Sequence, residues 1–227
     1  NVSGEYGGAH TGGLIGENYD AINLSNARGI VSGFADAGGL VDLNYGTITN
    51  SYASGAVTGQ NAGGLVGENF STISTSFAVG AVTGQNSSTL GGLVGVNEGS
   101  GQAISNSYST GTTNGGTSSS VGGLVGADTS GILASYSTGT VAGGANSVIG
   151  GSVGNVVKGA KNSATYWDTT TSGTDTGVGE GSLSGIAGLT TAQLQSGLPS
   201  GFNPTIWSES ANINDGLPYL ISNPPPK

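Results

Sequence analysis

The sequence Gly-Gly-Leu-Val-Gly, or a close variant of it, occurs six times along this 227-residue chain, and the repetition limits what the chain can fold into. The copies, which follow one another at intervals of 26, 25, 28, 31 and 28 residues, begin at Gly12, Gly38, Gly63, Gly91, Gly122 and Gly150. A period in this range is typical of repeat architectures, in which each unit buries its apolar side chains against the next unit.

Each repeat contains three short apolar patches. In the unit that starts at Gly63 they cover residues 65–66, 73–77 and 81–82, and Gly, Asn or Ser separate them. Short patches rich in β-branched and aromatic residues and bounded by turn formers are typical of strands. Each interior Gly would cost a helix about 1 kcal/mol. The repeats therefore predict an all-β fold, a parallel β-helix (β-solenoid) of about six coils, with about 4.8 Å between coils.

Stacked coils bring equivalent residues into columns, and the sequence supplies several columns of apolar side chains, two of which are singled out here. One column consists of Leu14, Leu40, Leu65, Leu93 and Leu124. The other is aromatic and consists of Tyr52, Phe77, Tyr108 and Tyr136. We expect both columns to form the core of the solenoid, because burial of such side chains is the main source of its stability.

A polar column follows the repeated motif, two residues after its last position. It consists of Asn18, Asn44, Asn69, Asn97 and Asp128. Asn tolerates the left-handed conformation of tight corners, and stacked Asn amides can hydrogen-bond to one another along the axis. We interpret the column as a structural ladder; a ligand-binding stripe is the alternative.

Three aromatic residues come directly after the first three members of the ladder: Tyr19, Tyr45 and Phe70. Inward packing is the interpretation that we favour for these rings. If they point outward instead, they form a strip that could contact carbohydrate or protein.

The repeat period stops after residue 160, which predicts three regions. Residues 1–160 form the repeat solenoid, residues 161–223 form an irregular region that caps its open end, and residues 224–227 form a Pro-rich linker. The cap contains one short helix near residues 190–195, with Thr190 or Thr191 as N-cap and Leu194 facing inward. Both tryptophans of the chain lie in this region, where large side chains are needed to cover the last coil.

The segments GGLVGEN, SYASGAVTG and SFAVGAVTG resemble the GLUG repeats of large bacterial surface adhesins of the filamentous haemagglutinin type. Similar repeats occur in IgA-specific metallopeptidases of Gram-positive bacteria. The segments around Tyr166, Leu189 and Leu217 resemble the region that often follows such repeats. The resemblance implies export to the bacterial cell surface, commonly through an outer-membrane secretion partner, and a role in adhesion or fibre building. The zinc-binding His-Glu-x-x-His pattern of the metallopeptidases is absent, so the resemblance does not imply their activity.

Charge and hydropathy argue against two classes of partner. The net charge is −9 and only four residues are basic, so the chain has no cluster that could neutralise the phosphates of a nucleic acid. No apolar run approaches the roughly 18 residues that a membrane-spanning helix needs.

Few residues suit catalysis or metal binding. His10 is the only histidine, and Glu17, Asp42 and Glu68 form a loose acidic strip that we interpret as solvated rather than catalytic. We predict no cofactor. The acids that could offer oxygen ligands to calcium are Asp168, Asp175, Glu180 and Asp215, and we interpret them as solvated loop residues.

These features together predict a non-catalytic structural or adhesive module of a secreted bacterial cell-surface protein. Its partners would be a host-cell or matrix receptor or glycan, with self-association in a fibre as a further expectation. The alternative is a glycan-binding or glycan-cleaving β-helix.

Overall fold

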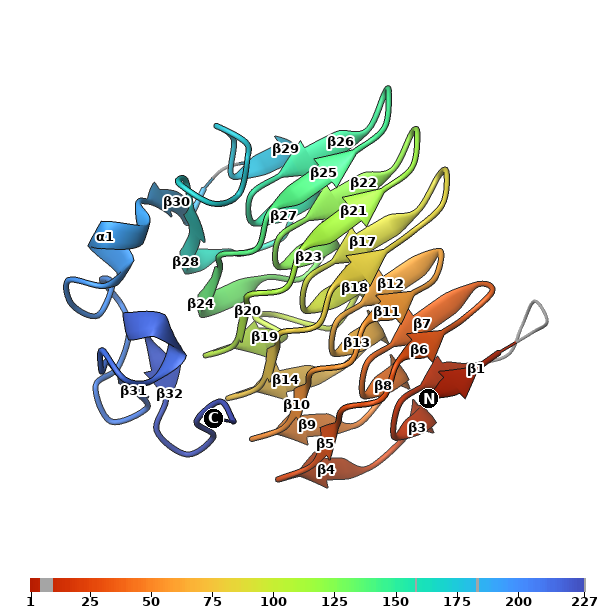
Figure 1. The fold of residues 1–227 in the computed structure, drawn as a ribbon, viewed down its shortest axis with the longest axis horizontal. Helices are drawn as coiled ribbons and strands as arrows, with labels where there is room; N and C mark the ends of the chain where they lie inside the picture. Colours follow the sequence, from red (N-terminus) through yellow and green to blue (C-terminus); the bar gives the residue numbers. More distant parts are fainter. Residues whose placement is uncertain (5–9, 158, 183, 227) are drawn as a thin grey trace.

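The computed structural model of the chain describes residues 1–4, 10–157, 159–182 and 184–226 and shows a parallel β-solenoid of about six coils (Figure 1), which confirms the predicted fold class. Four parallel sheets run along the axis, and each regular coil contributes strands to all of them. No helix among the described residues is long and apolar enough to cross a membrane.

Sheets A and B each contain six strands. Sheet A consists of β1 (Val2–Ser3), β6 (Val31–Ser32), β11 (Val57–Thr58), β16 (Val82–Thr83), β21 (Thr113–Gly115) and β25 (Val141–Gly143). Sheet B consists of β2 (Thr11–Gly12), β7 (Asp36–Gly38), β12 (Asn61–Gly63), β17 (Thr89–Gly91), β22 (Ser120–Gly122) and β26 (Val148–Gly150).

Sheet C has seven strands and sheet D has eleven. Sheet C consists of β3 (Ile15–Asn18), β8 (Val41–Asn44), β13 (Val66–Asn69), β18 (Val94–Asn97), β23 (Val125–Asp128), β27 (Val153–Val156) and β29 (Val178–Glu180). Sheet D consists of β4 (Ala21–Asn23), β5 (Asn26–Ala27), β9 (Thr47–Thr49), β10 (Tyr52–Ala53), β14 (Thr72–Ser74), β15 (Phe77–Ala78), β19 (Ile104–Ser105), β20 (Tyr108–Ser109), β24 (Ile132–Ser137), β28 (Ser163–Asp168) and β30 (Ile186–Leu189).

A regular coil contains five short strands, not the three that the apolar patches suggested. The Gly-Gly pair makes a corner between sheets B and C, where a Cβ on Gly63 would lie 1.9 Å from the Val66 carbonyl oxygen. A Cβ on Gly64 would lie 2.1 Å from the Gly92 carbonyl oxygen of the next coil. A second break falls inside the patch at 73–77, because Thr75 has a left-handed φ of 47° and divides β14 from β15. Only Gly fits the corner between sheets B and C, which explains why the Gly-Gly motif recurs in each coil.

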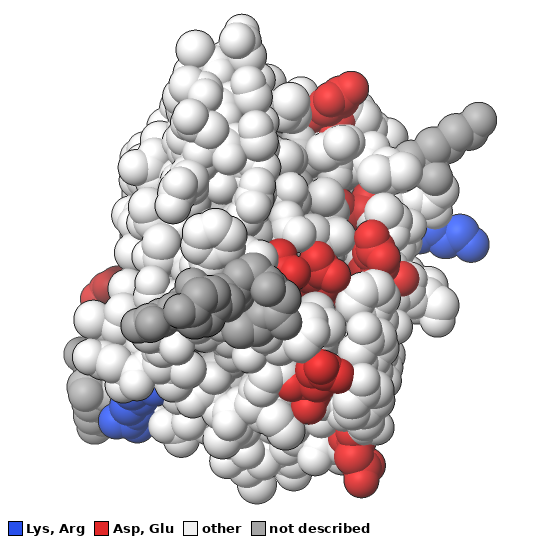
Figure 2. Space-filling model, turned by 90° about the vertical axis from the view of Figure 1, so that its right-hand side faces the viewer, with Lys and Arg blue, Asp and Glu red and all other residues white. Residues whose placement is uncertain are grey.

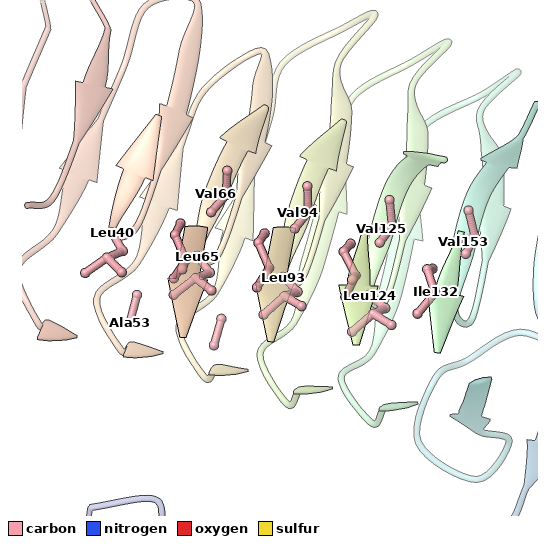
Figure 3. Close-up of a cluster of buried hydrophobic side chains, with 14 of the residues drawn as sticks. Leu40, Ala53, Leu65, Val66, Leu93, Val94, Leu124, Val125, Ile132 and Val153 are labelled. Atoms are coloured by element: carbon pink, nitrogen blue, oxygen red, sulfur yellow. The ribbon is translucent and has the colours of Figure 1, made fainter. Parts of the chain in front are cut away.

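The solenoid interior is filled by the predicted leucine column and by the valines that follow it. Figure 3 shows these Leu and Val side chains recurring at equivalent places in successive coils. Leu40, Leu65, Leu93 and Leu124 are fully buried. The assignment of Leu14 to the core is wrong: its side chain is 52% exposed. Sheet C ends at β3, so no strand of the described chain covers Leu14 from the other side.

The aromatic column forms as predicted but lies outside the solenoid interior. The rings of Tyr52, Phe77, Tyr108 and Tyr136 stack with centroid separations of 4.9, 4.9 and 5.1 Å. They belong to a separate apolar cluster, in which Phe202, Trp207 and Leu220 pack against them. The column is therefore buried by the C-terminal part of the chain and not by the coils themselves.

The C-terminal region differs from the predicted cap in both boundary and place. The stacked strands continue past residue 160, because β28 pairs with β24 and β30 pairs with β28, up to Leu189. Residues 198–223, which we call the C-terminal strap, then run back along the side of sheet D toward its first coils (Figure 1). The strap covers the side and not the end, because the outward aromatic column needs to be buried there.

The strap is fixed by hydrogen bonds to distant coils. Asn223 Nδ2 donates to the carbonyl oxygens of Ser51 and Thr75, at 3.2 Å each. Tyr136 donates its hydroxyl proton to the Pro218 carbonyl oxygen at 2.6 Å. Within the strap, β31 (Trp207–Ser208) and β32 (Tyr219–Leu220) form an antiparallel pair beside a 3-10 turn at Asn214–Gly216.

The predicted short helix is present as α1 (Thr191–Leu194). Thr190 is its N-cap in a capping box with Gln193, and Leu194 is fully buried, as predicted. The predicted linker residues Pro224, Pro225 and Pro226 belong to no helix or strand, and Lys227 lies outside the described residues.

Candidate functional site

The polar column forms a continuous ladder of side-chain hydrogen bonds along the axis. In each step the Nδ2 of one Asn donates to the side-chain oxygen of the next member, at 2.7, 2.8, 2.9 and 2.8 Å from Asn18 to Asp128. All members are buried. These contacts support the structural interpretation, because they occupy the groups that a ligand-binding stripe would need.

The expected left-handed backbone is not found at the ladder residues, which all end strands of sheet C. Positive φ angles occur instead at Leu24, Asn50, Thr75, Asn106, Ala134 and Ala164, at the bend within sheet D. The ladder amides are therefore selected by hydrogen bonding and not by the turn.

The ladder has a direction and a defined last member. Every donor points toward the C-terminal coils, and Asp128, which only accepts when ionised, receives the last bond. Burial raises the pKa of Asp128 although Asn97 and Ser130 donate to it. The next coil places Val156 at this position. At the other end, Asn18 is not preceded by a strand in sheet C of the described chain.

The three aromatic residues next to the ladder point outward, so the expectation of inward packing is wrong. Asn18, Asn44 and Asn69 are buried at the ends of their strands, and the chain leaves the strand with the next residue on the outer surface. Tyr19 is 72% exposed, Tyr45 is 42% exposed and Phe70 is half-buried.

We call this row of rings the aromatic strip: Tyr19, Tyr45 and Phe70. Their centroids are 5.1 and 4.9 Å apart, and the ring planes are within 12° of parallel. The middle ring, Tyr45, is stacked on both sides, so its edge and not its face meets solvent. The strip can therefore offer apolar ring edges and two phenol hydroxyl groups to a partner.

An acidic cluster with one histidine lies beside the strip. His10 Nδ1 is 3.2 Å from Asp42 Oδ2, and His10 Nε2 is 3.4 Å from Glu17 Oε1. The Tyr19 hydroxyl donates to Glu17 Oε2 at 2.5 Å, which connects the cluster to the strip. Acidic side chains gather on the face shown in Figure 2, and most of the rest of that face is uncharged.

Asp42 is the unusual member of this cluster, because the other repeats place Gly at its position. Its side chain is fully buried, Thr11 N donates to Oδ2 at 3.1 Å, and Oδ1 has no hydrogen-bond partner among the described residues. Burial and the nearby Asp36 raise the pKa of Asp42 to about 6, against the opposing effect of His10. Burial and Asp36 also raise the pKa of Glu68, which is only partly buried.

The sequence led us to expect a solvated acidic strip. The burial of Asp42 shows that the strip is not uniformly solvated. The break in the Gly column marks Asp42 in the sequence, and Glu17 and Glu68 do occupy equivalent positions, with Leu43 between them. The contact between His10 and Asp42, 32 residues apart, depends on the geometry of the coil and has no local signal.

Because the folded-state pKa of Asp42 lies above its ordinary value of 3.8, folding is most favoured when this group is protonated. We expect the stability of the protein to fall as the pH rises from about 4 through about 6, with a contribution from Asp42 of up to about 3 kcal/mol. Thermal denaturation from pH 4 to pH 7.5 measures this slope. Asp42→Asn should flatten it, whereas Asp20→Asn, at an exposed carboxyl group, should leave it unchanged. An unchanged slope in Asp42→Asn would contradict the assignment.

No three of the four acids considered for calcium lie together among the described residues. Asp168 is buried and accepts from Thr170 N at 2.8 Å and from Thr191 Oγ1 at 2.6 Å, so it fixes the start of α1. Asp175, Glu180 and Asp215 are exposed. Among the described residues, no group of three or more His, Asp or Glu side chains is arranged to hold a metal ion.

Comparison with models of known protein families finds no match, and comparison with curated proteins finds no relative either.

Proposed function

We propose that the chain is a structural and adhesive module of a secreted bacterial cell-surface protein, and that it works by presenting a surface to a partner. The aromatic strip carries this proposal. Contiguous exposed apolar patches with polar rims are typical of interaction sites. The coils hold the three rings at fixed spacing, so little conformational entropy is lost when a partner binds them.

The chemistry of the strip favours a protein receptor of the host cell or matrix over a glycan. A sugar ring stacks on an aromatic face, but both faces of Tyr45 and one face each of Tyr19 and Phe70 are covered by a neighbouring ring. Ring edges beside Glu17 suit a surface with apolar and basic side chains. The resemblance of the repeats to GLUG repeats of surface adhesins supports secretion, through an outer-membrane partner of the parent protein, and the location on the cell surface.

A test measures binding of the chain to a panel of extracellular matrix proteins and to a glycan array at physiological salt. We expect the double variant Tyr19→Ala/Tyr45→Ala to bind the protein partner at least tenfold more weakly, because exposed aromatic anchors often carry most of the binding energy. Phe34→Ala removes another exposed aromatic side chain, outside the strip, and serves as the matched control. Equal binding by the Tyr19/Tyr45 double variant and by Phe34→Ala would show that the strip is not the contact surface.

A second candidate function rests on the His10–Asp42 contact. A buried carboxyl group with a pKa of about 6 beside an imidazole is an arrangement that general acid–base catalysis uses, so a glycan-cleaving β-helix is the alternative. Release of reducing sugars from a polysaccharide panel tests it. Turnover that is lost in both His10→Gln and Asp42→Asn would establish the alternative and overturn the non-catalytic proposal.

A further inference from the structure

A small notch on the surface lies inside the stack of coils and not at either end of it. The loops that join sheet A to sheet B in three successive coils line this notch, and its volume is about 110 Å³. Every strand beside these loops pairs with another strand on both of its sides: β6, β11 and β16 in sheet A, and β7, β12 and β17 in sheet B. The coils that surround the notch therefore set its shape.

A difference in loop length produces the notch. In three later coils the loops between sheets A and B stack on one another and form a ridge: residues 84–88, 116–119 and 144–147. Each ridge loop turns at one residue whose φ lies between 56° and 62°: Ser87, Ser118 and Asn146. The coil before the ridge joins β11 to β12 with residues 59–60 alone. The ridge therefore ends in a step, at the edge of the solenoid that lies away from the C-terminal strap (Figure 1).

The notch combines one aromatic side chain with three amide side chains. Phe34 lines one side of it and is 69% exposed. Gln60 lies on the short loop, and Gln85 and Asn86 lie on the first loop of the ridge. The side-chain amides of Gln60 and Gln85 make no hydrogen bond within the described part of the chain. Their donors and acceptors are therefore available to a ligand.

The coils hold the backbone around the notch in place. Gln60 N donates to the Ala35 carbonyl oxygen, and Thr89 N donates to the Gln60 carbonyl oxygen at 2.8 Å. Asn86 Oδ1 accepts from Thr117 N at 3.0 Å, which orients this side chain and leaves its Nδ2 as a donor. A ligand would thus meet groups that are already positioned, and less conformational entropy would be lost on binding.

The lining indicates the class of ligand. None of the described residues that line the notch is charged, and the chain has a net charge of −9, so a neutral ligand is favoured over an anion. An aromatic ring offers an apolar surface to the C–H groups of a pyranose. An amide side chain both donates and accepts, as each sugar hydroxyl does. The small volume limits the site to one sugar ring.

We propose that the notch binds one pyranose ring of a neutral saccharide. Phe34 contacts the C–H groups of the ring, and the amides of Gln60, Gln85 and Asn86 hydrogen-bond to its hydroxyl groups. This inference goes beyond the proposed adhesive function and does not depend on it, because the aromatic strip follows sheet C, whereas the notch lies between sheets A and B.

NMR titration of the full, isotope-labelled chain tests the site. The probes are the methyl pyranosides of glucose, galactose and mannose, and the matching uronide of the bound sugar is the anionic comparison. We expect at least one neutral probe to shift the side-chain amide signals of Gln60, Gln85 and Asn86 saturably, with the millimolar dissociation constant of a single sugar ring. The uronide should bind more weakly, because the negative chain repels it.

Two kinds of variant test the lining. Phe34→Ala should weaken binding of the probe by about tenfold or more, whereas Phe34→Tyr, which keeps an aromatic ring, should bind it nearly as well as the parent chain. Insertion of Asn-Ser-Ser after Gln60 gives the short loop the sequence of residues 84–88, so the ridge would continue across the notch. This variant keeps Phe34 and should still lose binding. All of these changes are at the surface, so the melting temperature should stay close to that of the parent chain.

The matched control is the double variant Tyr19→Ala/Tyr45→Ala, which removes aromatic rings outside the notch and should bind the probe like the parent chain. The two sites therefore fail or succeed independently. The proposal would be overturned if none of the three glycosides gave saturable shifts, or if binding survived either Phe34→Ala or the insertion. An equal loss of binding in the Tyr19/Tyr45 double variant would also contradict it.

Discussion

Replacing Trp207 with Ala should lower the free energy of unfolding by about 3–5 kcal/mol, the range for a buried aromatic side chain. Trp207 is 1% exposed and its ring lies 4.6 Å from Phe202, 5.8 Å from Tyr136 and 6.0 Å from Tyr108, measured between centroids. Its indole N–H also donates to Asn106 Oδ1 at 3.2 Å. The side chain thus joins the strap to the aromatic column, and its loss opens a cavity between them.

Urea denaturation followed by far-UV circular dichroism measures this effect. Trp167, which is buried in the solenoid interior, remains in the variant and reports on the coils by its fluorescence. Ile221→Ala, at a half-exposed side chain of the same strap, is the control and should change the stability by less than about 1 kcal/mol. A loss in Trp207→Ala no larger than in this control would mean that the strap contributes little to the fold.

Replacing Asn69 with Ala should cost about 2–5 kcal/mol, because the variant leaves two buried groups without a partner. In the native chain Asn44 Nδ2 donates to Asn69 Oδ1 at 2.8 Å, and Asn69 Nδ2 donates to Asn97 Oδ1 at 2.9 Å. All three side chains are fully buried, so water cannot replace the lost bonds without a change in packing.

The matched control for the ladder is Asn114→Ala, at an exposed side chain in β21 of sheet A. Its melting temperature should stay within a few degrees of the parent chain, whereas that of Asn69→Ala should fall clearly below it. Equal melting temperatures for the two variants would show that the ladder bonds can be exchanged for water at no cost.

Much of the fold could be predicted from the sequence because each coil repeats the same local chemistry. The Gly-Gly corner, the leucine column and the Asn ladder all recur at equivalent positions, and a repeat places such positions above one another. Whether an apolar side chain points into the solenoid or away from it was harder to predict. Tyr52 and Leu65 are both apolar column residues, but Tyr52 faces out from sheet D and Leu65 faces in.

The contacts that were missed join residues far apart in the chain. Asn223 bonds to Ser51, 172 residues away, and no local pattern indicates that the chain returns to its first coils. The cluster at His10 was missed for the same reason, since His10 and Asp42 meet only once two coils are stacked. Periodicity predicts neighbours within the repeat, but it does not predict where a non-repeating segment packs.

The path of the strap has a mechanical consequence. Its last hydrogen bonds are to Asn50, Ser51 and Thr75, so the C-terminus leaves the molecule beside β9 and β10, in the same half of the solenoid as the N-terminus (Figure 1). A pulling force applied through the two termini would therefore act across the early coils alone. The later coils would carry no tension until the strap had peeled away from them, so a tethered molecule should lengthen in two separate steps.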